Sequence, residues 1–562
     1  MIATTGRAFP DRRIRERPRH RPDLLTAGHS GAPARQRTLR AVLDWSWDLL
    51  TESEQVVLRR LSVHVDGWTL GAAEAVAGGA GLDVPDLVAR LVDHSLVTTT
   101  GVDPPRYRLL ESVAAYSAAK LREAGGADEV ADVERRHRDH YARLAVTADH
   151  HLRGPGQSRW LRLLDAEATN LRAALDHAAR DGEALPVVES LAWCRVLRGR
   201  LGEGRRALTA ALAAGGPSGV AGTVQVWHAA FSLLMGVASG LVPSPVTRPT
   251  GAEDAARRAR AEWFLAGLGI GELGVGRDLV ASALAVFREQ DDRWGTAAAL
   301  GTLARYALAC SDLDAMAGHG ERSIALFTEV GDRWGQLHAT FGLGTHAEVV
   351  VGDYDRAARL HRDGLRIAEE LGLSTEVSDK LSAPGRIVLL TGDHEQADEL
   401  HECAREQAVA QGYTVGEEVA ELGLALGARR QGRFDQAEAL LRKWLVYDRR
   451  LESDIAVALI AAELGFIAEQ GGDADAARAL HLEGLAAARK AADPRAARLL
   501  GAAAALREQV GAPLPTGERG DVDRITATCR SASGEEAFTS AFTSALDDGR
   551  ARRESEVDLV VP

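Results

Sequence analysis

Hydrophobic residues follow helical spacing near the start of the chain. Between Thr38 and about Glu123, the first apolar positions form one helical stripe: Leu39, Val42, Leu43, Trp45, Leu49 and Leu50. The run TESE, from Thr51 to Glu54, follows the stripe. It is typical of a capping box, in which the Thr hydroxyl and the Glu carboxylate satisfy free backbone amides at a helix start. We therefore expect a helix from there to about Leu61.

The same region also predicts a short hairpin. Helical spacing recurs in three segments: Thr69–Ala77, Pro85–His94 and Glu111–Arg122. Between the last two, Ser95–Thr100 and Arg106–Leu110 are short apolar or Thr-rich runs on either side of a GVDPP turn. Helices followed by two short strands describe a winged helix, so we predict a winged-helix domain over residues 36–125.

The second half of the sequence repeats itself every 40 residues. Glycines keep this step at Gly352, Gly392, Gly432 and Gly472. The same step recurs in other residue types: Ala357, Ala397, Ala437 and Ala477; Leu360, Leu400, Leu440 and Leu480; His361, His401 and His481, with Leu441 in the third slot. An earlier pair, Ala285–Gly295 and Ala325–Gly335, has the same period. Because Gly permits a turn and Ala lets helices approach closely, the pattern predicts stacked helical hairpins.

The run GDYDRAARLH resembles the second half of a tetratricopeptide repeat, whose usual period is ~34 residues. We therefore predict an all-α chain, with a winged-helix domain followed by a tetratricopeptide-like α-solenoid over residues 126–512. The period is clearest over about 285–490. Leu171–Ala211 and Trp227–Gly276 are interpreted as earlier, degenerate hairpins, and residues 513–562 as a C-terminal cap and tail.

Composition supports this interpretation. Hydrophobic residues make up 46% of the chain and aromatic residues only 5%, which argues against a β-sandwich or barrel. The four cysteines form no CxxC pair, so we expect a reducing cytoplasm. The uncharged stretch Ala207–Thr247 contains Gln225 and His228, which favours a buried helix over a membrane span.

Charge is divided unevenly. Residues 1–40 carry a net charge of +7, which leaves −20 on the rest of a chain of net charge −13. An acidic body is a poor non-specific nucleic-acid binder, because neutralising phosphate requires a basic face. We expect residues 1–35 to be a disordered or remnant basic leader, with a nucleic-acid or membrane arm as the alternative.

Three blocks of the predicted winged helix resemble a known family. They are TLRAVLDWSWDLLTESEQVVLRRLSVHVDGWTLGAAEAV, LVARLVDHSLVTT and RYRLLESVAAYSAAKL. They resemble the AfsR-like and LuxR-like bacterial transcriptional regulators of the STAND class (signal-transduction ATPases with numerous domains). RRHRDHYARLA and WLRLLDAEATNLRAAL resemble the passage into the helical repeats of those proteins, and the likeness extends over about Leu24–Gly511. It implies a regulator whose winged helix packs against a nucleotide-binding NB-ARC-type module as a clamp.

The nucleotide-binding motif of that family has no counterpart in this sequence. The chain has four lysines: Lys120, Lys380, Lys443 and Lys490. None is preceded by Gly or followed by Ser or Thr, whereas a P-loop requires GxxxxGK[ST]. No response-regulator-type domain or LuxR-type helix-turn-helix is visible either. We therefore expect no nucleotide cofactor, and a truncation, a domain split or a different start codon stay open as the reason.

Repeated histidines raise the question of a metal site. His361, His401 and His481 recur at 40-residue steps, but stacked repeats advance by about 10 Å each, so the three cannot share one ion. We interpret them as packing positions. A second group has ligand-like spacing along a helix: His137, His140, His150 and His151. No carboxylate completes that pattern, so we expect a solvated helical face and no metal.

The sequence offers few other candidate sites. Trp294 and Trp334 recur in register, which favours packing over a ligand groove. The run GLGIGELG, Gly267–Gly274, is only weakly like a dinucleotide-binding loop, because no strand is predicted before it. We find no HExxH or GxSxG motif, and we predict no catalytic residues and no enzyme.

The predicted helix Pro85–His94 is the candidate DNA reader of the winged helix. Arg90 is its only cation able to contact a base, and it stands beside Asp86 and Asp93. Recognition helices usually present several basic or amide side chains. Arg90 is therefore the single, weak DNA-binding candidate.

Together these features suggest the regulatory and sensory part of a STAND-like transcriptional regulator. The solenoid surface would bind a protein or a small-molecule inducer, and the winged helix would relay its occupancy. The alternatives are a stand-alone tetratricopeptide scaffold or remnant without DNA binding or nucleotide switching, and an enzyme with an unrecognised site. DNA contact through the winged helix or a partner, and homo-oligomerisation, stay open.

Overall fold

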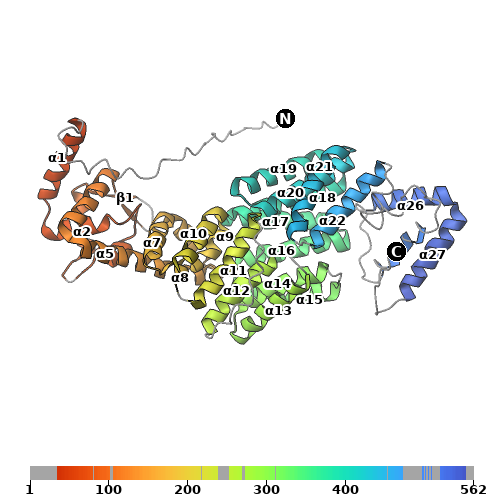
Figure 1. Cartoon of the computed structure of the whole chain (residues 1–562), viewed down its shortest axis with the longest axis horizontal. Coiled ribbons are helices and arrows are strands. Elements are labelled where there is room, and N and C mark those ends of the chain that lie inside the picture. Colours follow the sequence, from red (N-terminus) through yellow and green to blue (C-terminus); the bar gives the residue numbers. More distant parts are fainter. Residues whose placement is uncertain are drawn as a thin grey trace. The chain divides into compact units, whose positions relative to one another are not determined.

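A computed structural model describes most of the chain. The described residues are 34–79, 81–100, 105–216, 218–237, 252–268, 273–309, 312–451, 454–471, 519–551 and seven positions between 497 and 508. Almost all of the predicted basic leader lies outside them, as do four of the repeat positions: Gly472, Ala477, Leu480 and His481. The chain divides into two compact units, Met1–Tyr141 and Ala142–Pro562 (Figure 1). The predicted domain limits themselves stay predictions.

The first unit contains helices and one hairpin. In chain order the elements are α1 Ala34–Asp48, α2 Glu52–Leu61, α3 Leu70–Ala77, α4 Val84–Asp93, β1 Val97–Thr100, β2 Arg106–Leu109 and α5 Glu111–His151. The two strands pair antiparallel, with Val97 opposite Leu109. Trp68, before α3, forms an isolated antiparallel bridge to Tyr107. The predicted winged-helix arrangement is confirmed.

Local sequence signals explain where the helices begin. Thr51 caps α2: its Oγ1 accepts from the Glu54 amide at 3.4 Å, and Glu54 Oε2 accepts from the Thr51 amide at 2.7 Å. The predicted capping box is therefore present, and α2 ends at Leu61 as expected. The last predicted helix continues to His151 rather than to Arg122. Gly126 interrupts α5 with φ 64° and ψ −175°, so two helices meet there.

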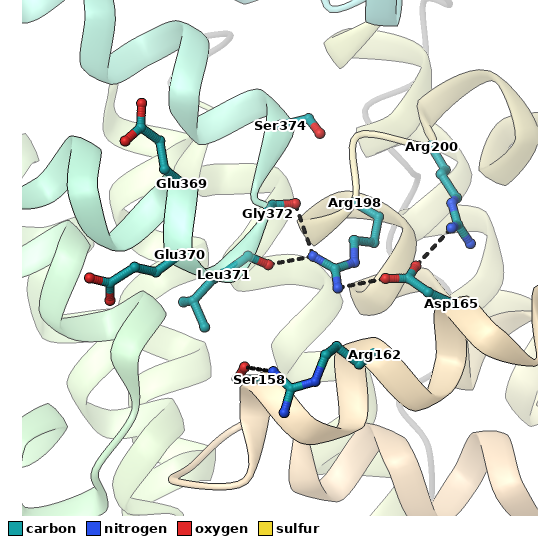
Figure 2. A pocket seen from close by; sticks show the side chains of 10 residues that line it. All are labelled: Ser158, Arg162, Asp165, Arg198, Arg200, Glu369, Glu370, Leu371, Gly372 and Ser374. Carbon is teal, nitrogen blue, oxygen red and sulfur yellow. Dashed lines mark hydrogen bonds and ion pairs between the residues drawn. The ribbon is translucent and has the colours of Figure 1, made fainter. Parts of the chain in front are cut away.

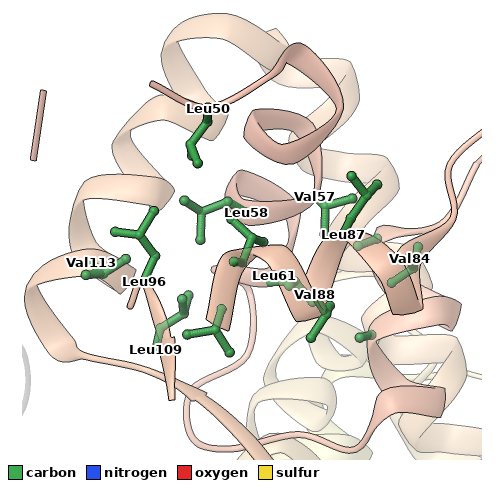
Figure 3. Packing of buried hydrophobic residues seen from close by; sticks show 14 of the residues in the cluster. Leu50, Val57, Leu58, Leu61, Val84, Leu87, Val88, Leu96, Leu109 and Val113 are labelled. Carbon is green, nitrogen blue, oxygen red and sulfur yellow. The ribbon is translucent and has the colours of Figure 1, made fainter. Parts of the chain in front are cut away.

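The core of the winged helix gathers residues from every one of its elements. Leu58 and Leu61 of α2 and Leu91 of α4 are almost completely buried, and Figure 3 shows Leu96, Leu109 and Val113 packed beside them. The apolar stripe predicted over α1 is partly wrong. The residues of this segment that enter the core are Leu43, Trp47 and Leu50. Four predicted stripe members face solvent: Leu39, Val42, Trp45 and Leu49.

The second unit is a series of helices. They are α6 Gln157–Ala166, α7 Ala168–Arg180, α8 Ala184–Ser190, α9 Ala192–Leu197, α10 Leu201–Ala214, α11 Ser218–Leu234, α12 Ala252–Gly267, α13 Leu273–Glu289, α14 Arg293–Ala309, α15 Leu313–Val330, α16 Arg333–His346, a π-helical turn Ala347–Val351, α17 Tyr354–Leu371, α18 Ser374–Thr391, α19 His394–Gln411, α20 Thr414–Arg430, α21 Phe434–Leu451, α22 Asp454–Gln470, α26 Gly520–Ser533 and α27 Glu535–Ala551. The predicted hairpin Leu171–Ala211 is four helices instead, because α8 and α9 are short.

Glycines end the repeat helices at the predicted positions. Gly352, Gly392 and Gly432 have left-handed backbones, with φ of 74°, 97° and 74°. Asp353 follows the first of them and caps α17, since its Oδ1 accepts from the Arg356 amide at 2.9 Å. A second glycine series lies halfway between these turns: Gly331, Gly372 and Gly412, with φ of 73°, 64° and 63°. Each 40-residue repeat is therefore a hairpin with a left-handed glycine at both of its turns.

The repeat helices form two layers. Consecutive helices pack together from α12 to α22, and contacts between every second helix join α12 to α14, α14 to α16 and α18 to α20. The short helix α9 contacts α18, so the coil returns to its own beginning (Figure 1). The even-numbered helices α12–α20 and α9 are called the inner layer below. Of the described helices, none has the length and apolar character needed to cross a membrane.

Candidate functional site

The second glycine series lies where the coil meets its own beginning. Gln157 Oε1 accepts from the Trp334 amide at 3.1 Å, which joins the start of α6 to the start of α16. One repeat later, Arg198 Nη1 donates to the carbonyl oxygen of Gly372 at 2.9 Å. These contacts between residues about 155–199 and residues about 331–374 are called the seam.

A surface pocket of about 470 Å³ lies in the seam (Figure 2). One wall contains Ser158, Arg162, Asp165 and Arg200, and the other contains Glu369, Glu370, Gly372 and Ser374. Arg198 crosses between the walls, with its Nη2 2.6 Å from Asp165 Oδ2. Figure 2 shows the carboxylates of Glu369 and Glu370 pointing away from Arg198. Arg198 thus joins the two walls, since it pairs with Asp165 on one side and donates to the Gly372 carbonyl on the other, and we assign the pocket to closure of the coil.

Four tryptophans fill the interior beside the seam. The rings of Trp193 and Trp334 lie 4.9 Å apart, and those of Trp263 and Trp294 lie 5.4 Å apart. All four side chains are buried. The predicted packing role of Trp294 and Trp334 is confirmed, and Trp193 on α9 joins them from the first part of the coil.

Next to this aromatic cluster the inner layer is polar. Six residues form what is called the inner polar cluster: Arg305 on α14, His338 on α16, Glu376, Asp379 and Lys380 on α18, and Tyr413 at the start of α20. Glu376 is its centre. Its Oε1 accepts from His338 Nε2 at 2.8 Å and from Trp334 Nε1 at 3.0 Å, and its Oε2 lies 3.4 Å from Lys380 Nζ.

The remaining members of the cluster are less completely paired. Asp379 Oδ2 accepts from the Tyr413 hydroxyl at 3.1 Å. Arg305 donates to the carbonyl oxygen of Gly267, the last residue of α12. Gly267 also begins the GLGIGELG run, of which positions 269–272 lie outside the described residues. The glycine thus ends a helix, and its carbonyl holds an arginine.

Burial and neighbouring charges shift the pKa values of the cluster. Burial raises the pKa of Asp379 to about 7; the charge of Lys380 opposes this rise, and the charge of Glu376 adds to it. Burial opposes ionisation of Glu376 too, but His338 and Lys380 outweigh it and hold the pKa of Glu376 far below its usual value. Burial lowers the pKa of Arg305 and of His338. Several shifted groups in one place are typical of a functional site.

Sequence reasoning did not predict this cluster. The available signal was local: Trp334 and His338 are one helical turn apart, and Glu376, Asp379 and Lys380 occupy one face of α18. Nothing in the 40-residue period indicates that Arg305, two repeats earlier than Asp379, belongs with them. Their meeting depends on how the repeats coil.

Two of the three repeated histidines are packing residues. His361 and His401 are buried, and His401 lies against Gly385 of α18 and Gly423 of α20 at distances that leave no room for a β-carbon. Burial lowers the pKa of His401 to about 4. His481 lies outside the described residues. Within the described part of the chain, no group of three His, Cys, Asp or Glu side chains could hold a metal ion.

The prediction of a solvated helical face is wrong at His137. This ring is buried, 5.2 Å from the ring of His64 and 4.7 Å from that of Tyr141. The reason is that α5 after Gly126 packs on the winged helix, with Val133 against Val76. The other three histidines of that group are partly or fully exposed: His140, His150 and His151.

Arg90 lies on the exposed face of α4. Its Nε is 2.9 Å from Asp86 Oδ2, and both side chains are more than half exposed. Asp93 lies on the same exposed face one turn later. The charge of Arg90 is therefore matched locally by Asp86, and its DNA-binding role stays a prediction.

Comparison with known families identifies the first unit. The family described as winged helix-turn-helix domain matches residues 50–122. Residues 50–122 form a winged helix-turn-helix domain. This range begins at the end of α1 and includes α4, the hairpin and the first part of α5.

Proteins similar in sequence to part of this chain occur in mycobacteria. A protein of Mycobacterium tuberculosis named as an HTH-type transcriptional regulator is 44% identical over 178 residues, which cover 30% of this chain and 19% of that protein. A protein of the same name from Mycobacterium bovis matches equally. An uncharacterized M. tuberculosis protein is 37% identical over 119 residues, covering 20% of this chain and 30% of its own length. The chain thus spans about a fifth of the length of the named regulators.

Solved structures with a similar arrangement are distant. A STAND protein with a tetratricopeptide repeat sensor from Pyrococcus horikoshii is 14% identical, with a TM-score of 0.34, over 90% of this chain and 66% of that one. A Rap protein complexed with competence and sporulation factor is 12% identical, with a TM-score of 0.39, over 64% of this chain and 99% of that one. At this level of similarity they support no inference about function.

Proposed function

We propose that this chain is the sensory and regulatory part of a transcriptional-regulator-like protein of the AfsR-like and LuxR-like STAND class. Its inner layer binds a partner or a small inducer, and the winged helix-turn-helix domain relays that occupancy. The protein acts in the cytoplasm and catalyses no reaction. The observation that carries the proposal is that one chain combines a domain of the winged helix-turn-helix family with a closed helical-repeat coil whose inner layer holds an accessible polar cluster.

The mycobacterial relatives support the regulatory half of the proposal, because they are named as HTH-type transcriptional regulators. Inner-layer side chains support the sensory half. A ligand that touches helices α14, α16 and α18 at once favours one arrangement of the repeats, and so shifts the population of conformations. Each 40-residue repeat contacts only its neighbours and the seam. A small change in the arrangement of one repeat therefore adds to the changes in the next ones along the coil.

The winged helix-turn-helix domain has a surface suited to the relay. The exposed apolar side chains of Leu39, Val42, Trp45 and Leu49 lie on or directly after α1, and Trp45 is 66% exposed. Exposed apolar surface of this kind is typical of protein contact sites. By contrast, the exposed face of α4 holds Arg90 between two aspartates, which suits DNA poorly.

Gene deletion in the host organism tests the regulatory function. We expect deletion to change the transcript levels of a defined gene set, and we expect the wild-type chain to restore them. Trp45→Glu should fail to restore them while leaving the fold intact, because Trp45 is exposed. Asp48→Asn, on the same helix, is the control and should restore them.

The scaffold alternative predicts a different result. Unchanged transcripts after deletion would overturn the regulatory function. Recovery of one stable partner with the tagged chain, under the same conditions, would then favour a tetratricopeptide scaffold without nucleotide switching.

A further inference from the structure

The seam pocket holds more positive than negative charge on the side of α6 and α10. Three guanidinium groups line it, those of Arg162, Arg198 and Arg200. The carboxylate that faces them is Asp165, which lies 2.6 Å from Arg198 Nη2 and 2.7 Å from Arg200 Nη2. Arg162 is three residues before Asp165 on α6 and therefore shares its helix face. One negative charge thus serves two positive charges, and a third positive charge stands beside them.

Arg162 is not neutralised by a carboxylate. Among the residues that the structure describes, no Asp or Glu oxygen lies within 4.0 Å of its guanidinium nitrogens. Its Nη1 instead donates to the Ser158 hydroxyl at 2.6 Å. This single bond to a neutral group leaves most of the five guanidinium donors for another acceptor. Because the Arg162 side chain is exposed, a ligand in the pocket can reach it.

The two glutamates of the second wall do not balance this charge. Glu370 has two arginine partners of its own, Arg333 and Arg366, each at 2.7 Å. Glu369 is exposed, and Figure 2 shows the carboxylates of both glutamates pointing away from Arg198. On the opposite side three guanidinium groups face one carboxylate, an excess of two positive charges.

The start of α18 adds to the positive potential of the pocket. Ser374 is the first residue of α18 and lines the second wall. No side chain caps this helix, because Leu373 stands at the position where Asp353 and Asp393 cap α17 and α19. The free amides of an uncapped helix start carry partial positive charge. They reinforce the attraction of the arginines for an anion.

The volume and lining of the pocket indicate the kind of anion. Its volume of about 470 Å³ lies within the range of ~300–1,000 Å³ that is typical of small-molecule sites. Most such sites are lined by apolar side chains. Here Leu371 is the one apolar side chain among the lining residues, and Ser158 and Ser374 contribute hydroxyls. A ligand that fits this pocket is therefore hydrophilic and larger than a bare inorganic ion.

We propose that the seam pocket binds a small hydrophilic phosphate ester, such as a sugar phosphate, with its phosphate group between Arg162 and Arg200. A phosphate monoester carries a charge of about −1.5 to −2 near pH 7, which matches the excess of two positive charges. A guanidinium can hold phosphate through two parallel hydrogen bonds. Ser158 can donate as well, since its oxygen accepts from Arg162 and its own O–H remains available.

The site is separate from the inner polar cluster, so the inference goes beyond the sensory function proposed above. Its walls belong to early and late parts of the coil, α6 and the start of α10 on one side and the turn between α17 and α18 on the other. A ligand that fills the pocket contacts both walls and favours the closed seam over an open one. Binding should therefore slow hydrogen exchange of the peptide around Leu371–Ser374.

Calorimetric titration of the purified full chain tests the proposal. The probes are glucose 6-phosphate, ribose 5-phosphate and glycerol 3-phosphate, each compared with its parent compound without phosphate and with inorganic phosphate. We expect at least one ester to bind with a Kd below about 1 mM, and the parent compounds not to bind. Inorganic phosphate should bind more weakly than that ester. Equal binding of inorganic phosphate would show that the pocket holds the ion alone and would overturn the ester as its ligand.

Two variants and two matched controls assign the binding to this pocket. Arg162→Gln and Arg200→Gln should each weaken binding of the ester by about 10- to 100-fold, since each removes a charged hydrogen-bond donor. Arg159→Gln on α6 and Arg206→Gln on α10 remove exposed arginines that do not line the pocket, and both should bind like the wild type. Circular dichroism would confirm that all four variants are folded.

The possible results separate this inference from the proposed function. Absence of any bound ester, or equal weakening by the control variants, overturns the phosphate site and leaves the regulatory function standing. A bound ester that Arg162→Gln weakens, together with unchanged transcripts after gene deletion, would instead overturn the regulatory function and leave the site standing. Binding without slower hydrogen exchange at Leu371–Ser374 would contradict a ligand that contacts both walls.

Discussion

Arg198 donates a hydrogen bond to the carbonyl oxygen of Gly372, 174 residues further along the chain, at 2.9 Å. The same guanidinium reaches Asp165 at 2.6 Å, and only 11% of the Arg198 side chain is exposed. Arg198 therefore joins α6 to the turn between α17 and α18. Because these elements lie in early and late parts of the coil, this residue holds the closed arrangement that the inner layer requires.

Replacing Arg198 by alanine should open the seam. We expect Arg198→Ala to lower the free energy of unfolding by about 1–3 kcal/mol, since the carbonyl oxygens of Leu371 and Gly372 and the Asp165 carboxylate lose a charged donor. Hydrogen exchange of the peptide around Leu371–Ser374 should accelerate. Arg200→Ala is the control: Arg200 contacts the same carboxylate of Asp165, at 2.7 Å, and should have a smaller effect. Equal effects of the two variants would contradict a special role for Arg198.

The buried carboxyl pair of Glu418 and Asp448 should make stability depend on pH. Burial and the neighbouring Asp448 raise the pKa of Glu418 from 4.5 to about 8. Between these values the folded chain binds more protons than the unfolded chain, so the free energy of unfolding falls as pH rises toward 8. Below pH 4.5 the contribution is fully present, and above 8 it is lost.

Glu418→Gln removes this dependence, because the amide is always neutral and can still donate to Asp448. We expect the variant to be more stable than the wild type near about pH 9 by on the order of 1 kcal/mol, and similar to it near about pH 5. Thermal unfolding at several pH values measures the difference. Glu417→Gln is the control, since Glu417 instead pairs with Lys443 at 2.9 Å. A parallel pH profile of wild type and Glu418→Gln would be incompatible with a protonated pair.

Gly423 is required by the packing of His401. A β-carbon at Gly423 would lie 2.2 Å from Cε1 of the His401 ring, which is buried between α18 and α20. Gly423→Ala should therefore destabilise the chain by about 1–3 kcal/mol. Gly318→Ala, on α15, has no neighbouring atom within 4 Å and should stabilise it slightly. The additional change His401→Ala should relieve part of the clash, and failure to do so would show that another contact is responsible.

DNA binding through α4 should be weak and independent of Arg90. Arg90 is paired with Asp86 at 2.9 Å on an exposed face that also holds Asp93. We expect fluorescence anisotropy with duplex DNA to show no specific complex at about 200 mM salt, and no change with Arg90→Ala. A sequence-specific complex that Arg90→Ala weakens would establish α4 as a recognition helix.

Local patterns predicted much of the fold. The capping box Thr51–Glu54 predicted the start of α2, and the glycines at 40-residue steps predicted one of the two turns of each repeat. Such signals succeed because a cap or a left-handed turn depends on atoms within a few residues. The pattern was wrong where two faces of a helix are both apolar, as on α1, where Trp47 rather than Trp45 is buried.

The candidate site could be predicted only in fragments. Glu376, Asp379 and Lys380 are close in the sequence, and so are Trp334 and His338. Their association with Arg305 and Tyr413 is a property of several repeats. In the same way, no spacing indicated that Trp193 would join Trp263, Trp294 and Trp334.

The sequence by itself determined that this protein is a winged helix followed by stacked helical hairpins, because helix spacing, caps and turn glycines act over short distances. Only the tertiary structure decided that the coil closes from Arg198 to Gly372 and that Trp193 lies against Trp334. The physical reason is that the rotation between neighbouring repeats is small and is set by side-chain packing. Its sum over many repeats, which no local pattern records, determines which distant residues meet.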